Sequence, residues 1–177
     1  MRIISGELKG RRLKSFQGQT IRPTSDKVKG AIFNVLNTKV QSARVLDLFA
    51  GTGGLALEAL SRGAGSAVLV DMSRQAVQLI QENIKLLGNP VQAHVIHEDA
   101  CRFIRRYTGA KFDLVFMDPP YHQNLVETLL PDLQGKVNQN GVIVAETGKD
   151  EMFSAEPFVI RIVKEYGDSK VWFLQNP

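Results

Sequence analysis

The sequence predicts an α/β protein whose sheet is mainly parallel and carries one antiparallel strand at its C-terminal end. From residue 44 onward, short apolar runs alternate with longer segments in which apolar residues recur at helical spacing. This alternation is typical of parallel βαβ units whose sheet is covered on both faces. The last two apolar runs, 158–164 and 170–174, are joined by residues 165–169. That link is too short for a crossover, so the two strands must pair antiparallel.

The N-terminal region predicts a small β-hairpin followed by a helix. Residues 1–16 contain two short arms, 3–4 and 12–13, with glycines between them. The helix is expected over residues 23–37, because Pro23 fixes the chain and a hydroxyl residue after it can cap. We therefore expect a basic hairpin over residues 1–16, attached to one domain over residues 17–177 that includes this helix.

The remaining elements follow from the same alternation. Strands are expected at residues 44–49, 66–71, 92–97, 112–117, 141–146, 158–164 and 170–174. Helices are expected at residues 54–62, 73–87, 100–107 and 123–133.

Composition excludes several classes of protein. Of the 177 residues, 44% are apolar and 23% charged, which is ordinary for a soluble globular domain. The single cysteine, Cys101, excludes an internal disulfide, and the absence of Cys/His clusters argues against a structural zinc site. No apolar run approaches the length of a membrane span, and no export signal precedes the first strand. We expect no membrane or metal partner and a cytoplasmic location.

Charge is distributed unevenly along the chain. Residues 1–44 hold ten lysines and arginines against two acidic residues, a net charge of +8, whereas residues 45–177 carry −4. A basic segment on a mildly acidic body suggests a surface that faces a polyanion. A solvated charged arm is the alternative.

A glycine-rich turn follows the first expected parallel strand. Gly51, Gly53 and Ala56 match the pattern G-x-G-x-x-A, in which the backbone approaches a ligand closely. Asp71 lies 20 residues beyond Gly51, at the end of the next strand, where it can accept both hydroxyls of a ribose. These features predict a nucleoside-containing cofactor. Alternatively, the glycines only close the turn and Asp71 caps the next helix.

Both NAD and S-adenosylmethionine fit this turn, and two acidic residues favour the second. Asp47, just before the glycines, can accept hydrogen bonds from an ammonium group but would face an unfavourable pyrophosphate in NAD. Asp99 can accept from the adenine amino group, while the amide of Ala100 or Cys101 faces the ring. Asp99 is also a candidate helix cap.

Residues 118–121 (Asp-Pro-Pro-Tyr) end a buried strand and are the most informative stretch of the chain. Two prolines stiffen the loop and leave the Asp118 carboxylate and Pro119 carbonyl as acceptors, with the Tyr121 ring beside them. This arrangement can hold a planar base by its amino group. The two acceptors favour the positive charge that grows on the nitrogen during methyl transfer. The alternative is purely structural: a proline turn that ends the strand, with Tyr121 as a packing residue.

Several stretches together resemble one family. Residues 118–121 match the (D/N/S)PP(Y/F/W) motif of amino-methyltransferases. Residues 22–29 with Phe33-Asn34, residues 47–53 and residues 57–64 resemble the bacterial RsmD-like small-subunit (16S) rRNA guanine-N2 methyltransferases. The resemblance covers nearly the whole chain. Thr52 stands where many members have serine, a small change.

The resemblance implies a Rossmann-like class I methyltransferase fold with seven strands. It also implies transfer of a methyl group from S-adenosylmethionine to the exocyclic N2 amine of one guanine in 16S rRNA. Asp118, Pro119, Pro120 and Tyr121 are then the catalytic residues. Thr24 is expected near the methionine end of the cofactor. The other expected cofactor residues are Asp47, Phe49, Ala50, Gly51, Gly53, Asp71, Met72, Asp99 and Ala100.

Basic residues of the N-terminal region are the expected RNA contacts. They are Arg2, Lys9, Arg11, Arg12, Lys14, Arg22, Lys27 and Lys29. The expected partner is ribosomal RNA, in the small subunit or an assembly intermediate, and the expected state is a monomer.

Other functions stay open on the residues alone. They are a DNA amino-methyltransferase acting on adenine N6 or cytosine N4, an NAD-dependent oxidoreductase, a non-catalytic RNA-binding module, and a cytosine-C5 enzyme with Cys101 as nucleophile.

Overall fold

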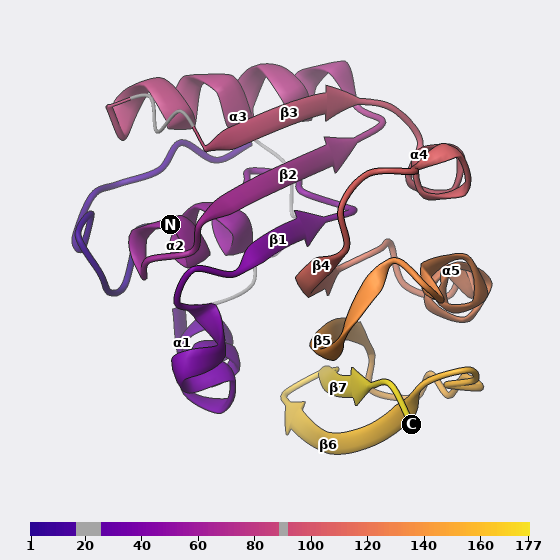
Figure 1. The fold of residues 1–177 in the computed structure, drawn as a ribbon. Coiled ribbons are helices and arrows are strands. Elements are labelled where there is room, and N and C mark those ends of the chain that lie inside the picture. Colours follow the sequence, from indigo (N-terminus) through magenta and orange to yellow (C-terminus); the bar gives the residue numbers. More distant parts are fainter. Residues whose placement is uncertain (17–25, 89–91) are drawn as a thin grey trace.

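A computed structural model describes residues 1–16, 26–88 and 92–177. Within these ranges seven strands form one sheet in the order β3-β2-β1-β4-β5-β7-β6 (Figure 1). The strands are β1 (Arg44–Asp47), β2 (Ser66–Asp71), β3 (Ala93–His97), β4 (Phe112–Met117), β5 (Val137–Gly148), β6 (Val159–Tyr166) and β7 (Ser169–Gln175). The helices are α1 (Asp26–Leu36), η1 (Asn37–Val40), α2 (Gly54–Ser61), α3 (Arg74–Leu86), α4 (Ala100–Arg106) and α5 (Leu125–Leu133).

The sheet is the middle of three layers. Helices α1, α2 and α3 pack on one face and α4 and α5 on the other (Figure 1). Side chains of a strand point alternately to the two faces, so Val45 joins the first core and Leu46 the second. Both faces of the central strands are therefore buried, as the near-continuous apolar runs predict.

The C-terminal hairpin confirms the expected antiparallel strand. β7 pairs antiparallel with both β5 and β6, while the other strand pairs of the sheet are parallel. The predicted Rossmann-like α/β architecture, seven-stranded and mainly parallel with one antiparallel strand, is confirmed.

Most element boundaries differ from expectation by one to three residues, and β5 differs most. It begins at Val137 rather than residue 141, because Val137 pairs with Phe112 beside an irregularity in the β4 register. Helix α5 begins at Leu125 rather than residue 123, since Asn124 adopts a left-handed conformation with φ 53°. The first three positions of the expected helix 23–37 lie outside the described residues.

Residues 1–16 pair with themselves but form no regular strand. One antiparallel bridge joins Arg2 and Arg12, and the N–H of Ile3 donates to the carbonyl of Arg11 at 2.9 Å. Ile3 and Leu13 are buried against Leu57 of α2 and Leu87 after α3. The expected hairpin is thus a short turn fixed to the body by its apolar side chains. None of the helices in the described ranges has the length and apolar character that crossing a bilayer requires.

Candidate active site

A cavity of about 900 Å³ opens at the carboxyl ends of the parallel strands. Open α/β sheets bind their ligands at this edge, and the volume lies within the range of roughly 300–1,000 Å³ that is typical of small-molecule sites. The cavity brings together most of the predicted cofactor and substrate residues: Phe49, Gly51, Asp71, Met72, Asp99, Ala100, Asp118, Pro119, Pro120 and Tyr121. Segments far apart in the sequence therefore meet at one site.

Asp71 ends β2 and holds the glycine turn beside the start of α3. Its Oδ2 accepts the N–H of Gly51 at 2.8 Å, and its Oδ1 accepts the N–H of Ser73 at 2.8 Å. The cap of α3 is Ser73 itself, whose hydroxyl accepts the N–H of Ala76 at 3.3 Å. A carboxylate can accept about four hydrogen bonds, so Asp71 can organise the turn and still bind ligand hydroxyls.

The two glycines of the turn serve different purposes. Gly51 lines the cavity with φ 53°, and its amide is held by Asp71. Gly53 has φ 78° and is the N-cap of α2. A Cβ at Gly53 would lie 3.1 Å from Leu57 and 3.2 Å from Leu69. Gly53 therefore lets helix and strand pack closely, and it is not among the residues that line the cavity.

Asp47 and Ala50 lie beneath the turn rather than along the cavity. Burial raises the pKa of Asp47 to about 7; hydrogen bonding by the backbone of Ala56 and Phe49 opposes this rise, and the charge of Asp71 adds to it. Asp47 thus faces the backbone of the turn and of α2. Its predicted contact with a ligand ammonium group stays a prediction.

Asp99 caps α4, as the alternative interpretation proposed. Its Oδ1 accepts the N–H of Arg102 at 2.9 Å, while the residue also lines the cavity. The neighbouring Cys101 thiol has a raised pKa because burial and the Asp99 charge disfavour the thiolate. A raised thiol pKa argues against the alternative in which Cys101 is the nucleophile of a cytosine-C5 enzyme.

The loop at residues 118–121 presents the expected groups to the cavity. Asp118 is partly buried, Pro119 is buried, and Tyr121 is 39% exposed. The Tyr121 hydroxyl donates to Oε1 of Glu146 at 3.1 Å. The pKa of Tyr121 is raised, first by burial and then by the charges of Glu146 and Asp118. The ring is therefore neutral and held at one edge, which leaves a face for stacking.

A second carboxylate fixes this loop to the end of β5. Glu151 Oε1 accepts the N–H of His122 at 2.8 Å, and its Oε2 accepts the N–H of Gly148 at 2.6 Å. Because one side chain holds both backbones, the loop after β4 and the end of β5 form one rigid wall.

Several residues of the cavity were not predicted from the sequence. The most informative is Glu146, which is 8% exposed and lies two residues before the carboxyl end of β5, within its buried run. A charge at the carboxyl end of a buried strand is the signal that singled out Asp118, and it was available for Glu146 too. Other unpredicted residues of the cavity include Phe16, Val28, Gln75, Gln123, Tyr166, Asp168 and Ser169.

Most predicted RNA contacts that the structure describes lie at the surface. Lys9, Arg12 and Lys27 are exposed. Three others are exposed but engaged: Arg2 pairs with Asp26 at 3.0 Å, Lys14 pairs with Glu82 at 2.9 Å, and Arg11 donates to the Leu86 carbonyl at 3.3 Å. Arg22 and Thr24 lie outside the described residues.

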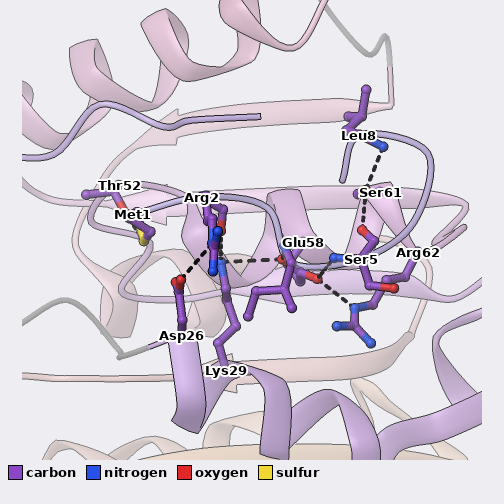
Figure 2. Close-up of polar contacts among 11 residues, drawn as sticks. Met1, Arg2, Ser5, Leu8, Asp26, Lys29, Thr52, Glu58, Ser61 and Arg62 are labelled. Carbon is purple, nitrogen blue, oxygen red and sulfur yellow. Dashed lines mark hydrogen bonds and ion pairs between the residues drawn. The ribbon is translucent and has the colours of Figure 1, made fainter. Parts of the chain in front are cut away.

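Lys29 does not fit the prediction of a phosphate contact. Its side chain is 1% exposed, and its Nζ lies 3.4 Å from Glu58 Oε2 and donates to the Arg2 carbonyl at 2.6 Å (Figure 2). Burial lowers its pKa and the Glu58 charge opposes that shift. Lys29 neutralises a buried acid and is not part of the charged surface.

The polar groups that line the cavity suit a nucleoside-containing ligand better than a metal ion. Carboxylates at or near the carboxyl ends of four strands (Asp71, Asp99, Asp118 and Glu146) give the cavity acceptors for hydroxyl and amino groups, and its walls add ring-sized apolar surface. Within the described residues, no group of three or more His, Cys, Asp or Glu side chains could hold a metal.

Comparison with known proteins gives a consistent result. The family described as "conserved hypothetical protein 95" matches residues 1–175. Ribosomal RNA small subunit methyltransferase D of Haemophilus influenzae is 35% identical over 155 residues, covering 85% of this chain and 80% of that protein. The protein of the same name from Buchnera aphidicola subsp. Acyrthosiphon pisum is 32% identical over 151 residues, covering 84% and 78%.

The fold agrees with solved structures as well. A hypothetical protein of Thermus thermophilus superposes with a TM-score of 0.84 at 30% identity, covering 99% of both chains. Since the match extends over almost the whole sequence and includes the residues around the cavity, the chain belongs to the RsmD-like methyltransferase family.

Proposed function

We propose that this protein transfers a methyl group from S-adenosylmethionine to the exocyclic N2 amine of a guanine in small-subunit ribosomal RNA. One observation carries the proposal: Asp71 and Asp99, the two carboxylates expected to bind the nucleoside part of the donor, line the same cavity as Asp118 and Tyr121. The names of the relatives support ribosomal RNA as the substrate class.

The first half of the cavity suits the methyl donor. Asp71 accepts the ribose hydroxyls, Asp99 accepts the adenine amino group, and Gly51 lets the donor approach the backbone. S-adenosylmethionine bound there supplies a methyl group activated by a sulfonium.

The second half suits the amine. The Asp118 carboxylate and the Pro119 carbonyl accept the two N–H groups of the guanine amine, and Tyr121 stacks on the base. Both acceptors stabilise the positive charge that grows on nitrogen as its lone pair forms the new bond to the methyl carbon, while the carbon–sulfur bond of the donor breaks and S-adenosylhomocysteine leaves. The proton then leaves for Asp118 or for water. Glu146 holds the Tyr121 hydroxyl and keeps the ring in register with these acceptors.

The exposed cations of the N-terminal segment, residues 1–16, and Lys27 of α1 suit phosphate contacts. A base within a helix must be extruded to reach the cavity, at a cost of about a few kcal/mol. An assembled subunit or assembly intermediate that presents the target guanine in an exposed RNA loop would reduce this cost.

The test is methyl transfer from tritiated donor to small ribosomal subunits from a strain that lacks the enzyme. We expect incorporation into RNA and, after digestion and mass mapping, N2-methylguanosine at one position. Asp118→Ala should abolish incorporation. Methyl groups on a ring atom, or transfer to adenine or cytosine of DNA in a parallel reaction, would overturn the proposal.

A further inference from the structure

The N-terminal segment contributes to the wall of the donor cavity as well as to the charged surface. Phe16 lines the same cavity as Gly51, Asp71 and Asp99. This placement puts the segment next to the methyl donor. The charge of the segment, taken alone, predicts only that it lies next to RNA.

Buried carboxylate and hydroxyl groups fix the first half of the segment to α2. Glu58, 0% exposed, accepts the N–H groups of Ile4 at 2.7 Å and Ser5 at 3.0 Å (Figure 2). The Ser61 hydroxyl accepts the N–H of Leu8 at 3.0 Å and donates to the Ser5 carbonyl at 2.6 Å. A Cβ at Gly6 would lie 1.7 Å from the Ser61 carbonyl oxygen. The segment therefore has one tightly defined position on the helix.

Asn83 of α3 fixes the second half of the segment to the glycine turn. Its side chain is 0% exposed. Its Oδ1 accepts the N–H of Lys14 at 2.7 Å, and its Nδ2 donates to the Lys14 carbonyl at 3.2 Å and to the Thr52 carbonyl at 2.9 Å. One amide thus satisfies both backbone groups of Lys14, two residues before Phe16, and a carbonyl next to Gly51. The N-terminal segment and the donor-binding turn are held as one unit.

We infer that Phe16 contacts the methyl donor and that Asn83 is the positioning residue that places it there. The inference rests on the proposed function, which takes the ligand of the cavity to be S-adenosylmethionine. Phe16 supplies apolar area to the donor, and Asn83 keeps it at a fixed distance from the glycine turn. The N-terminal segment therefore serves two ligands through different residues: the donor through Phe16, and RNA through the exposed cations.

The test is calorimetric binding of S-adenosylhomocysteine to the full chain without RNA. Phe16→Ala should weaken binding about tenfold, because an aromatic contact is lost, whereas Phe16→Leu should stay within about threefold. Lys14→Ala is the matched control: it keeps the backbone bonds to Asn83 and removes only the side chain, so donor affinity should not change. In filter binding, the same Lys14→Ala should weaken RNA affinity, and Phe16→Ala should not.

Asn83→Asp keeps the acceptor for the Lys14 N–H and removes the two donors. It should weaken S-adenosylhomocysteine binding at least as much as Phe16→Ala, because Asn83 also holds the Thr52 carbonyl of the glycine turn. Adding Phe16→Ala to it should weaken binding little further, because Phe16 has already lost its position. If Phe16→Ala binds the ligand as tightly as the wild type, or if the two changes are additive, the inference is wrong. If the wild type itself does not bind S-adenosylhomocysteine, the proposed function fails instead.

Discussion

Replacing Glu58 by alanine should lower the free energy of unfolding by about 3–5 kcal/mol. The carboxylate lies 2.7 Å from Arg62 Nε and 3.4 Å from Lys29 Nζ and accepts two backbone N–H groups of the N-terminal segment (Figure 2). Without it, the ammonium of Lys29 stays buried, and two amides lose their acceptor. The estimate follows from leaving a buried charge uncompensated, which costs far more than losing an exposed pair.

Urea denaturation followed by the fluorescence of the single tryptophan, Trp172, measures this loss, since the residue is 5% exposed in β7. A thermal melt should show a lower midpoint by about 10 °C, taking roughly 2–4 °C per kcal/mol for a chain of this size. Glu82→Gln is the control, because it breaks the exposed pair with Lys14 and should leave the curve unchanged. A Glu58→Ala loss below about 1 kcal/mol would refute the reasoning.

A double-mutant cycle separates the buried charge from the lost hydrogen bonds. Glu58→Gln keeps an oxygen for the two amides but leaves Lys29 without its counter-charge. Adding Lys29→Met to Glu58→Gln removes the stranded ammonium, so the double variant should be more stable than Glu58→Gln alone. If the two changes simply add, the ion pair is not the source of the effect.

The remaining predictions concern charge and chemistry. Asp118→Ala should abolish methyl transfer while donor affinity by calorimetry stays within about threefold; lost donor binding would place Asp118 elsewhere. Tyr121→Phe removes one hydrogen bond worth about 1 kcal/mol and should lower the rate of methyl transfer a few-fold. Tyr121→Ala also removes stacking on the base, worth about 1–3 kcal/mol, and should lower the rate further. Equal losses from the two variants would contradict a stacking role. The pKa of Asp47 rises from 3.8 to about 7 on folding, so the folded state binds this proton more tightly than the unfolded state does. The stabilisation that the protonated carboxyl gives to the folded state is complete below about pH 4 and is lost as the pH rises to about 7. The difference in urea stability between wild type and Asp47→Asn should therefore change by about 4 kcal/mol across that window, and a constant difference would show that this carboxyl does not titrate there. Lys27→Met should reduce the salt dependence of RNA binding by about one phosphate contact, while Lys29→Met should leave it unchanged; the opposite pattern would reverse their assignments.

The sheet could be predicted because its signal is local. Apolar runs bounded by helical segments identify parallel strands without knowledge of their neighbours, and the short link before β7 dictates antiparallel pairing. The early start of β5 could not be predicted in this way. Residues 138–141 (Asn-Gln-Asn-Gly) are typical of a turn when taken locally, and they are strand because Val137 finds a partner in Phe112.

The site, too, divides into residues that a local pattern predicts and residues that depend on contacts between distant segments. Asp71, Asp99 and Asp118 follow strands, and parallel topology places the ends of strands at one edge. The bond between Glu146 and Tyr121 depends instead on β5 lying next to β4 in a particular register, which no local pattern encodes. The N-terminal contribution depends on Asn83, a residue in a helix with an ordinary amphipathic pattern, so Phe16 was not predicted.

Lys29 and Glu58 are a different case, because the sequence did contain a signal for them. Residues 29, 32, 33 and 36 of α1 follow the i, i+3, i+4, i+7 spacing of a buried stripe, with lysine in the first position. In α2, Glu58 stands in a helix whose other side chains are almost all apolar. A cation on one buried stripe and an acid on another require each other, because an isolated buried charge is prohibitively costly. The charge excess of residues 1–44 therefore divides into an exposed part that suits RNA and a buried part that fixes the N-terminal segment. Counting charges along the chain cannot separate the two, whereas the helical position of each residue can.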